Sequence, residues 1–138
     1  MRPRPPRPSQ PRGLASSGPG SIADARVLLR DAEASLDAAG AQEDVEAVAA
    51  HAIRAAVAAA DAICCVALRE RSAGGSEVAA VELLGRVDRK LSAALKRALD
   101  RQTQAAYESR DISASDARMC LRQAEILLEA ARARVLSV

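Results

Sequence analysis

The chain has 138 residues, 49% of them hydrophobic and 28% charged, a length and balance that suit a single globular domain. Aromatic residues make up 1%, with no Phe and no Trp, so the core has to be built from aliphatic residues. The net charge is +2, but Arg2, Arg4, Arg7 and Arg12 all precede the first acidic residue, Asp24. Without them, 16 basic residues stand against 18 acidic ones, a balance of −2, which excludes a domain that is basic throughout.

The first 20 residues are predicted to be a disordered leader rich in Pro and Arg. Pro, Gly and Ser favour an extended, solvated chain, and the segment has little apolar surface with which to fold. It lacks the continuous apolar stretch of about 7 to 15 residues that a secretory signal requires. The three cysteines show no C-x-x-C spacing, so we expect reduced thiols and a cytoplasmic protein. Residues 21–138 are then the folded domain.

The first predicted helix begins after Ser21 and ends at Gly40. Ser21 and Asp24 resemble a capping box, and glycine is a common residue at the end of a helix. The second helix, from residue 45 to about 71, is dense in alanine and ends before Gly74-Gly75. Its apolar residues recur at i, i+3, i+4 and i+7, the pattern of a buried face that needs partner helices.

A line of polar residues runs along this second helix, formed by His51, Arg54, Asp61 and Cys65. Because charges interrupt the apolar run, we predict a core helix and no membrane span. His51 lies about 15 Å from Asp61 along the helix, too far to share a metal ion with it, so no metal site and no cofactor are expected. Asp61 is more simply a buried acceptor paired with an arginine or with a neighbouring helix end.

Three further helices are predicted. Ser76 caps a short third segment that ends near Gly85 and directs Val78 inward, and a break near Asp88 separates it from a fourth helix that continues to about Ser109. Ser113 caps the last helix. No segment alternates apolar and polar residues over the length of a strand, so the predicted fold is all-α: an antiparallel up-down bundle of four main helices plus a short additional helix.

Two residue types receive specific predictions within this bundle. Cys64 and Cys120 fall on core faces, where free cysteine behaves as a small hydrophobe. Tyr107, the only aromatic residue, is predicted to pack beneath the turn between the fourth and fifth helices, with a base-stacking role as the alternative.

The order of these elements resembles the HEPN domain over about residues 22 to 136, in particular the small, Ala-rich, single-domain HEPN-like proteins. The resemblance rests on short segments of all five helices: Leu28-Leu29 with Ala32, Ala60-Asp61-Ala62, the Val81-Glu82-Leu83-Leu84 helix, Arg101 to Ala106-Tyr107, and Ile112-Ser113 with Asp116-Ala117 and Ala124.

The resemblance implies a symmetric dimer and, in catalytic members, cleavage of RNA by an Arg followed after four to six residues by a His. In this chain Arg101 corresponds to the Arg. The positions for the His hold Ala106, Tyr107 and Glu108, so the general acid or base is missing from its place. This departure argues against nuclease activity, and no catalytic residue is predicted.

Three functional hypotheses remain open at this point. The first is a noncatalytic binding module, a homodimer that contacts RNA, a nucleotide or a protein partner. Its predicted binding residues are His51, Arg54, Asp61, Arg97, Arg101, Gln104 and Tyr107. The second is a divergent ribonuclease toxin of a toxin-antitoxin pair, and the third is a structural adaptor whose helix faces assemble with another chain.

Overall fold

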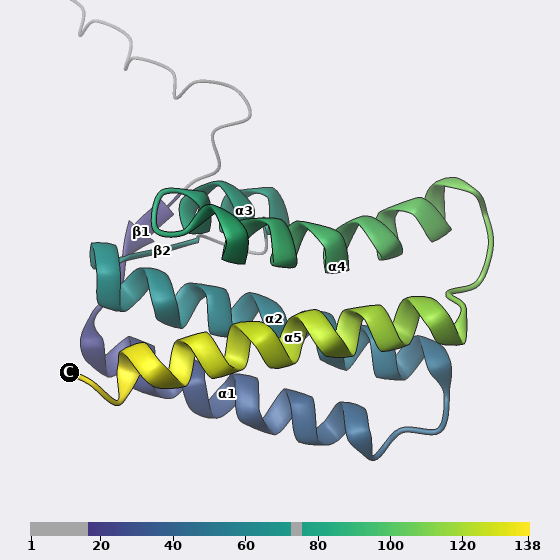
Figure 1. Cartoon of the computed structure of the whole chain (residues 1–138), viewed down its shortest axis with the longest axis horizontal. Coiled ribbons are helices and arrows are strands. Elements are labelled where there is room, and N and C mark those ends of the chain that lie inside the picture. The colour runs from purple at the N-terminus through teal and green to yellow at the C-terminus, as the bar shows by residue number, and fades with distance from the viewer. Residues whose placement is uncertain (1–16, 73–75) are drawn as a thin grey trace, which may run out of the picture.

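The computed structural model describes residues 17–72 and 76–138, and within them the chain is mostly helical. The described residues form five helices that pack against one another and one small two-stranded sheet (Figure 1). In chain order the elements are β1 (Ser17–Pro19), α1 (Ile22–Gly40), α2 (Val45–Leu68), β2 (Glu70–Ser72), α3 (Glu77–Gly85), α4 (Arg89–Tyr107) and α5 (Ala114–Val135).

Helix α2 is the centre of the bundle and packs mainly against α1 and α5, while α4 lies along α5 and beside α3 (Figure 1). Seven of its eleven alanines are buried, which lets the neighbouring helices approach closely. Among the described helices, α2 is the one long and apolar enough to cross a membrane by length and composition alone, and most of that stretch is buried inside the bundle. The core is completed by large aliphatic side chains with almost no exposed surface: Ile63, Leu84, Leu95 and Leu127.

The predicted helix starts are confirmed. Ser21 and Ser113 each accept a hydrogen bond from the backbone N–H three residues on, and Asp24 and Asp116 complete the two capping boxes. Asp88 caps α4, so the predicted break before the fourth helix is also present. These caps depend on residues three positions apart, which is why the sequence reveals them.

The all-α prediction is wrong in one detail, because β1 and β2 pair as antiparallel strands. The second helix was expected to continue to about residue 71, but it ends at Leu68. Arg69 has a left-handed φ of 56°, and the chain then turns into β2. The predicted leader reached residue 20, yet Ser17–Pro19 form β1. The expected stop at Gly74-Gly75 and residues 1–16 of the leader lie outside the described residues.

The sheet is held against the end of α2 by Gly20. Its backbone N–H donates to the carbonyl of Arg69 over 2.9 Å, and the residue is buried. A Cβ atom at this position would lie 2.5 Å from Sγ of Cys65, so only glycine permits this approach. Cys65 was assigned to the polar line of α2, but it is fully buried, because the backbone at Gly20, between β1 and α1, lies against its sulfur.

Four other side chains test the predicted burial. Cys64 and Cys120 are buried in the core, as predicted. Val78 was expected to point inward, but its side chain is 61% exposed. Tyr107 was expected to pack beneath the turn after α4, but it is 90% exposed, because Ala105 rather than Tyr107 occupies the inward position of the last helical turn.

Candidate functional site

The structure divides the predicted binding residues among four places. Arg54 and Asp61 line a cavity of about 580 Å³ between α2, β2 and α4, whereas Arg97 lines a groove between α4 and α5. Arg101, Gln104 and Tyr107 lie near the C-terminal end of α4, and His51 is partly buried on α2. The expected single binding surface is therefore not formed by these seven residues together.

Asp61 is a structural anchor for β2. Its Oδ1 atom accepts hydrogen bonds from the backbone N–H of Ser72 over 3.0 Å and from the Ser72 hydroxyl over 2.6 Å. Burial raises the pKa of the Asp61 carboxyl, against the lowering effect of the two Ser72 bonds and of the positive charge of Arg71. The prediction that Asp61 is a buried acceptor is confirmed, but the predicted partner, an arginine or a neighbouring helix end, is wrong: the partner is Ser72 of the strand β2.

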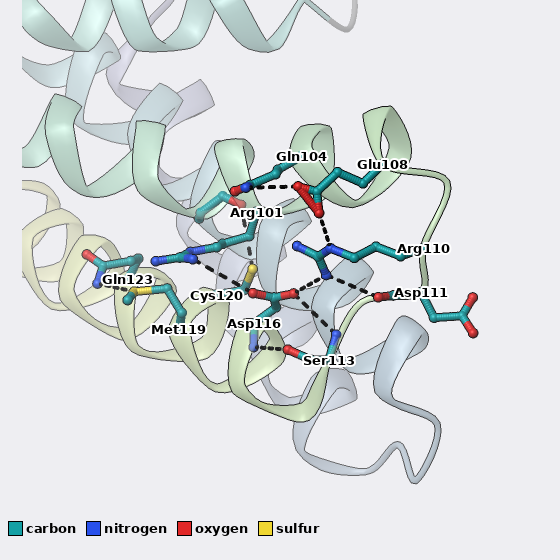
Figure 2. Close-up of polar contacts among 11 residues, drawn as sticks. Arg101, Gln104, Glu108, Arg110, Asp111, Ser113, Asp116, Met119, Cys120 and Gln123 are labelled. Atoms are coloured by element: carbon teal, nitrogen blue, oxygen red, sulfur yellow. Dashed lines mark hydrogen bonds and ion pairs between the residues drawn. The ribbon is translucent and has the colours of Figure 1, made fainter.

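A network of charged side chains holds the turn between α4 and α5 (Figure 2). Arg110 donates to Asp116 over 2.9 Å and to Glu108 over 2.7 Å, and a nitrogen of Arg101 lies 3.9 Å from the other Asp116 oxygen. Gln104 donates to the second oxygen of Glu108 over 3.2 Å. Arg101 and Gln104, two predicted binding residues, are thus engaged in stabilising this turn.

The three positions where a catalytic histidine was expected hold Ala106, Tyr107 and Glu108. Ala106 and Tyr107 are exposed, and Ala106 has no titratable side chain. The hydrogen bond from Arg110 is the largest cause that lowers the pKa of the Glu108 carboxyl, and the bond from Gln104 is the next. A general acid or base works best with a pKa near the working pH, so this shift moves Glu108 away from such a role.

The groove between α4 and α5 has a cavity of about 700 Å³ and a cationic rim. Arg89, Lys90 and Arg97 line it together with one carboxylate, that of Asp88. None of these three cations makes an ion pair within 4 Å with another residue of the described ranges, whereas Asp88 lies 3.9 Å from a nitrogen of Arg134. The groove thus presents positive charge that is available to a ligand.

Gln123 is the unusual residue of this groove. Its side chain is buried, with 4% of the residue exposed, and it lines the cavity between α4 and α5. Its Nε2 atom donates to Sδ of Met119 over 3.3 Å, a weak acceptor (Figure 2). Its Oε1 atom has no hydrogen-bond partner among the described residues. Buried polar groups are nearly always paired, so this buried carbonyl is an exception within the helix packing beside the groove.

The sequence contained a signal for Gln123 that its interpretation missed. The residue lies three positions after Cys120 and four before Leu127, the spacing of the buried face of α5. A polar residue at an inward position of an otherwise apolar face indicates a special environment.

Among the described residues, no three His, Cys, Asp or Glu side chains gather as a metal site would require. Comparisons with protein-family models, with curated proteins and with solved structures find no match for this chain. The candidate site therefore has to be interpreted from its own chemistry, as a groove with a cationic rim between α4 and α5.

Proposed function

We propose that this protein is a noncatalytic, HEPN-like binding module that acts as a homodimer and binds RNA or nucleotides in the groove between α4 and α5. The observation that carries the proposal is the gathering of three cations around one cavity, Arg89, Lys90 and Arg97, none of which makes an ion pair within 4 Å among the described residues. Phosphate groups are attracted by Lys and Arg side chains.

The noncatalytic part of the proposal is supported by the end of α4. The three positions expected for a histidine hold Ala106, Tyr107 and Glu108, and Arg110 holds the Glu108 carboxylate. The exposed ring of Tyr107 offers a face on which a base can stack. The proposed dimer rests on the family resemblance and on the small aliphatic core, which favours self-association.

Fluorescence anisotropy with a labelled 12-nucleotide single-stranded RNA tests the binding. The paired substitutions Lys90→Ala and Arg97→Ala are expected to weaken binding and to flatten its salt dependence by a slope of about one or two, because each lost phosphate contact removes roughly one released counterion. Arg30→Ala is the matched control, since Arg30 is an exposed arginine on α1, away from the groove. No measurable RNA or nucleotide binding by the unaltered protein would contradict the proposal and would favour a protein partner.

Gel analysis of the same RNA after prolonged incubation tests the absence of catalysis. We expect the RNA to stay intact in the presence and absence of divalent metal ions. Cleavage that is lost in Arg101→Ala or His51→Ala would instead support a divergent ribonuclease toxin. Light scattering of the purified chain measures the proposed homodimer, and a strict monomer at working concentrations would remove that part of the proposal.

A further inference from the structure

We infer that the ligand of the groove between α4 and α5 is a single strand of RNA several nucleotides long, and that Arg118 and Arg122 of α5 hold the part of the strand that extends past the cavity. The inference rests on the proposed function, because it concerns the same groove. It goes further in naming the class of nucleic acid and two binding residues that lie outside the cavity.

The register of the two helices places these arginines beside the groove. Helices α4 and α5 run antiparallel along each other (Figure 1). The thiol of Cys120 donates to the backbone carbonyl of Ala98 over 3.6 Å, which fixes these two residues at the same level. Arg122 therefore lies close to the level of Arg97, and Arg118 lies about one helical turn further toward the C-terminal end of α4.

Both arginines are on the side of α5 that bounds the groove. Arg118, Arg122 and Ile126 are spaced four residues apart, the spacing of neighbouring side chains on a helix surface, and Ile126 lines the cavity. The two arginines are exposed, and neither makes an ion pair within 4 Å with another residue of the described ranges. Their positive charge is therefore available to a ligand that leaves the cavity along this side of α5.

The cations beside the groove form a line and not a single cluster. At about 1.5 Å per residue, the distance along α4 from Lys90 to the level of Arg118 is about 15 Å. The repeated phosphates of a strand can meet cations at several points of such a line. A nucleoside monophosphate carries its phosphate at one end and can meet only one of these points.

The acidic residues of α5 indicate the direction in which the strand extends. Glu125 and Glu129 are exposed and follow Arg122 in the chain, so they lie toward the level of the start of α4. The other part of the groove, beside Arg97, Arg118 and Arg122, therefore has the greater excess of positive charge. We expect the strand to continue from the cavity in this direction.

The floor of the groove favours unpaired bases. Leu91, Ala94 and Ile126 line the cavity and give it an apolar surface. The bases of a single strand can turn toward such a surface, whereas those of a duplex are stacked inside the helix and are recognised mainly through phosphates and sugars. A single strand can thus use both the floor and the cations, and a duplex only the cations.

Fluorescence anisotropy on the full chain with labelled oligouridine of 4, 8 and 12 nucleotides tests the length of the binding line. Affinity is expected to rise by at least about fivefold from 4 to 12 nucleotides, because the longer strand makes additional phosphate contacts. A 12-base-pair RNA duplex should bind at least about fivefold more weakly than the 12-nucleotide strand, because its paired bases cannot reach the apolar floor.

The double substitution Arg118→Ala and Arg122→Ala should weaken binding of the 12-nucleotide strand by about fivefold. It should lower the salt slope by about 1.4, because each phosphate contact of a single strand contributes about 0.7. Replacing both arginines by Lys keeps the charges and should retain most of the affinity. The matched control is Arg132→Ala on the same helix, since Arg132 pairs with Glu33 of α1 and should not affect RNA binding. Both altered arginines are exposed, so the melting temperature of the double variant should be nearly unchanged.

Equal affinity for 4 and 12 nucleotides, a duplex that binds as tightly as the single strand, or a loss no greater in the double variant than in Arg132→Ala would overturn this inference. Inorganic polyphosphate that competes as well as the 12-nucleotide strand would also overturn it, since the bases would then contribute nothing. If RNA or nucleotides still bound through Lys90 and Arg97 in any of these cases, the proposed function would stand. Absence of any RNA or nucleotide binding would overturn both.

Discussion

Replacing Asp61 by Asn and by Ala tests whether this buried residue serves the fold through its oxygen atoms or through its charge. Asp61 accepts two hydrogen bonds from Ser72 and so connects α2 to β2. An Asn side chain keeps an oxygen acceptor for both bonds without the negative charge. An Ala side chain removes the acceptor and leaves the N–H and hydroxyl of Ser72 without this partner.

The expected magnitudes follow from these contacts. Loss of an acceptor that leaves a partly buried donor unpaired costs about 1 to 3 kcal/mol, so Asp61→Ala should lower the melting temperature by roughly 4 °C or more. Burial is the largest cause that raises the pKa of Asp61, so at neutral pH the desolvation of the ionised carboxylate outweighs the gain from its bonds. Asp61→Asn should therefore be neutral or stabilising, by up to about 1 kcal/mol.

The pH dependence provides a second measurement. Because the folded pKa of Asp61 lies above the unfolded one, the stability that its protonated form contributes is fully present below the unfolded pKa. This stability is lost as the pH rises through the folded pKa. The advantage of Asp61→Asn should therefore be greatest at neutral pH and shrink on acidification.

Urea denaturation followed by far-ultraviolet circular dichroism at several pH values measures both effects. Ser72→Ala is a useful companion variant, because it removes the hydroxyl bond and keeps the backbone bond to Asp61. If Asp61→Asn destabilised the protein as much as Asp61→Ala at neutral pH, the reasoning from desolvation would be refuted.

Three further predictions concern other parts of the fold. Gly20→Ala should destabilise the protein by roughly 1 to 3 kcal/mol in denaturant titrations, because the added Cβ would lie 2.5 Å from Sγ of Cys65. Gly18→Ala should be nearly neutral, since no atom lies within 4 Å of its added Cβ, and equal effects of the two substitutions would contradict the packing described. Arg110→Ala should reduce the loss of stability on acidification, because the hydrogen bond from Arg110 is the main cause that lowers the pKa of Asp116. Stability from a lowered pKa is present above the unfolded pKa and is lost as the pH falls through the folded pKa. If the melting temperature of the variant fell with acidification as steeply as that of the unaltered protein, this role of Arg110 would be refuted. The three cysteines should resist thiol reagents in the native state and react on unfolding, because burial raises their thiol pKa values to about 11 or 12. Rapid labelling of the folded protein would contradict this prediction and would show that the core opens easily.

The candidate site could be predicted only in part. Arg97 was named as a binding residue and does line the cationic groove. Arg101 and Gln104 were named with it, but Gln104 donates to Glu108 of the turn network, and a nitrogen of Arg101 lies 3.9 Å from Asp116 at the start of α5. A helical wheel shows which residues share a face of one helix, but not which charges of a neighbouring segment meet that face.

The local features of this protein were determined by its sequence alone. Residues three or four positions apart decide a capping box such as that of Ser113 with Asp116 and a buried stripe such as that of α2, so periodicity and caps predict five helices and most of their boundaries. Only the tertiary structure decided the contacts between distant segments. Glu70–Ser72 becomes a strand because β1 pairs with it and Asp61 holds it, and Cys65 becomes buried because the backbone at Gly20 lies against its sulfur. Such contacts join residues far apart in the chain, and no periodicity within one helix contains that information.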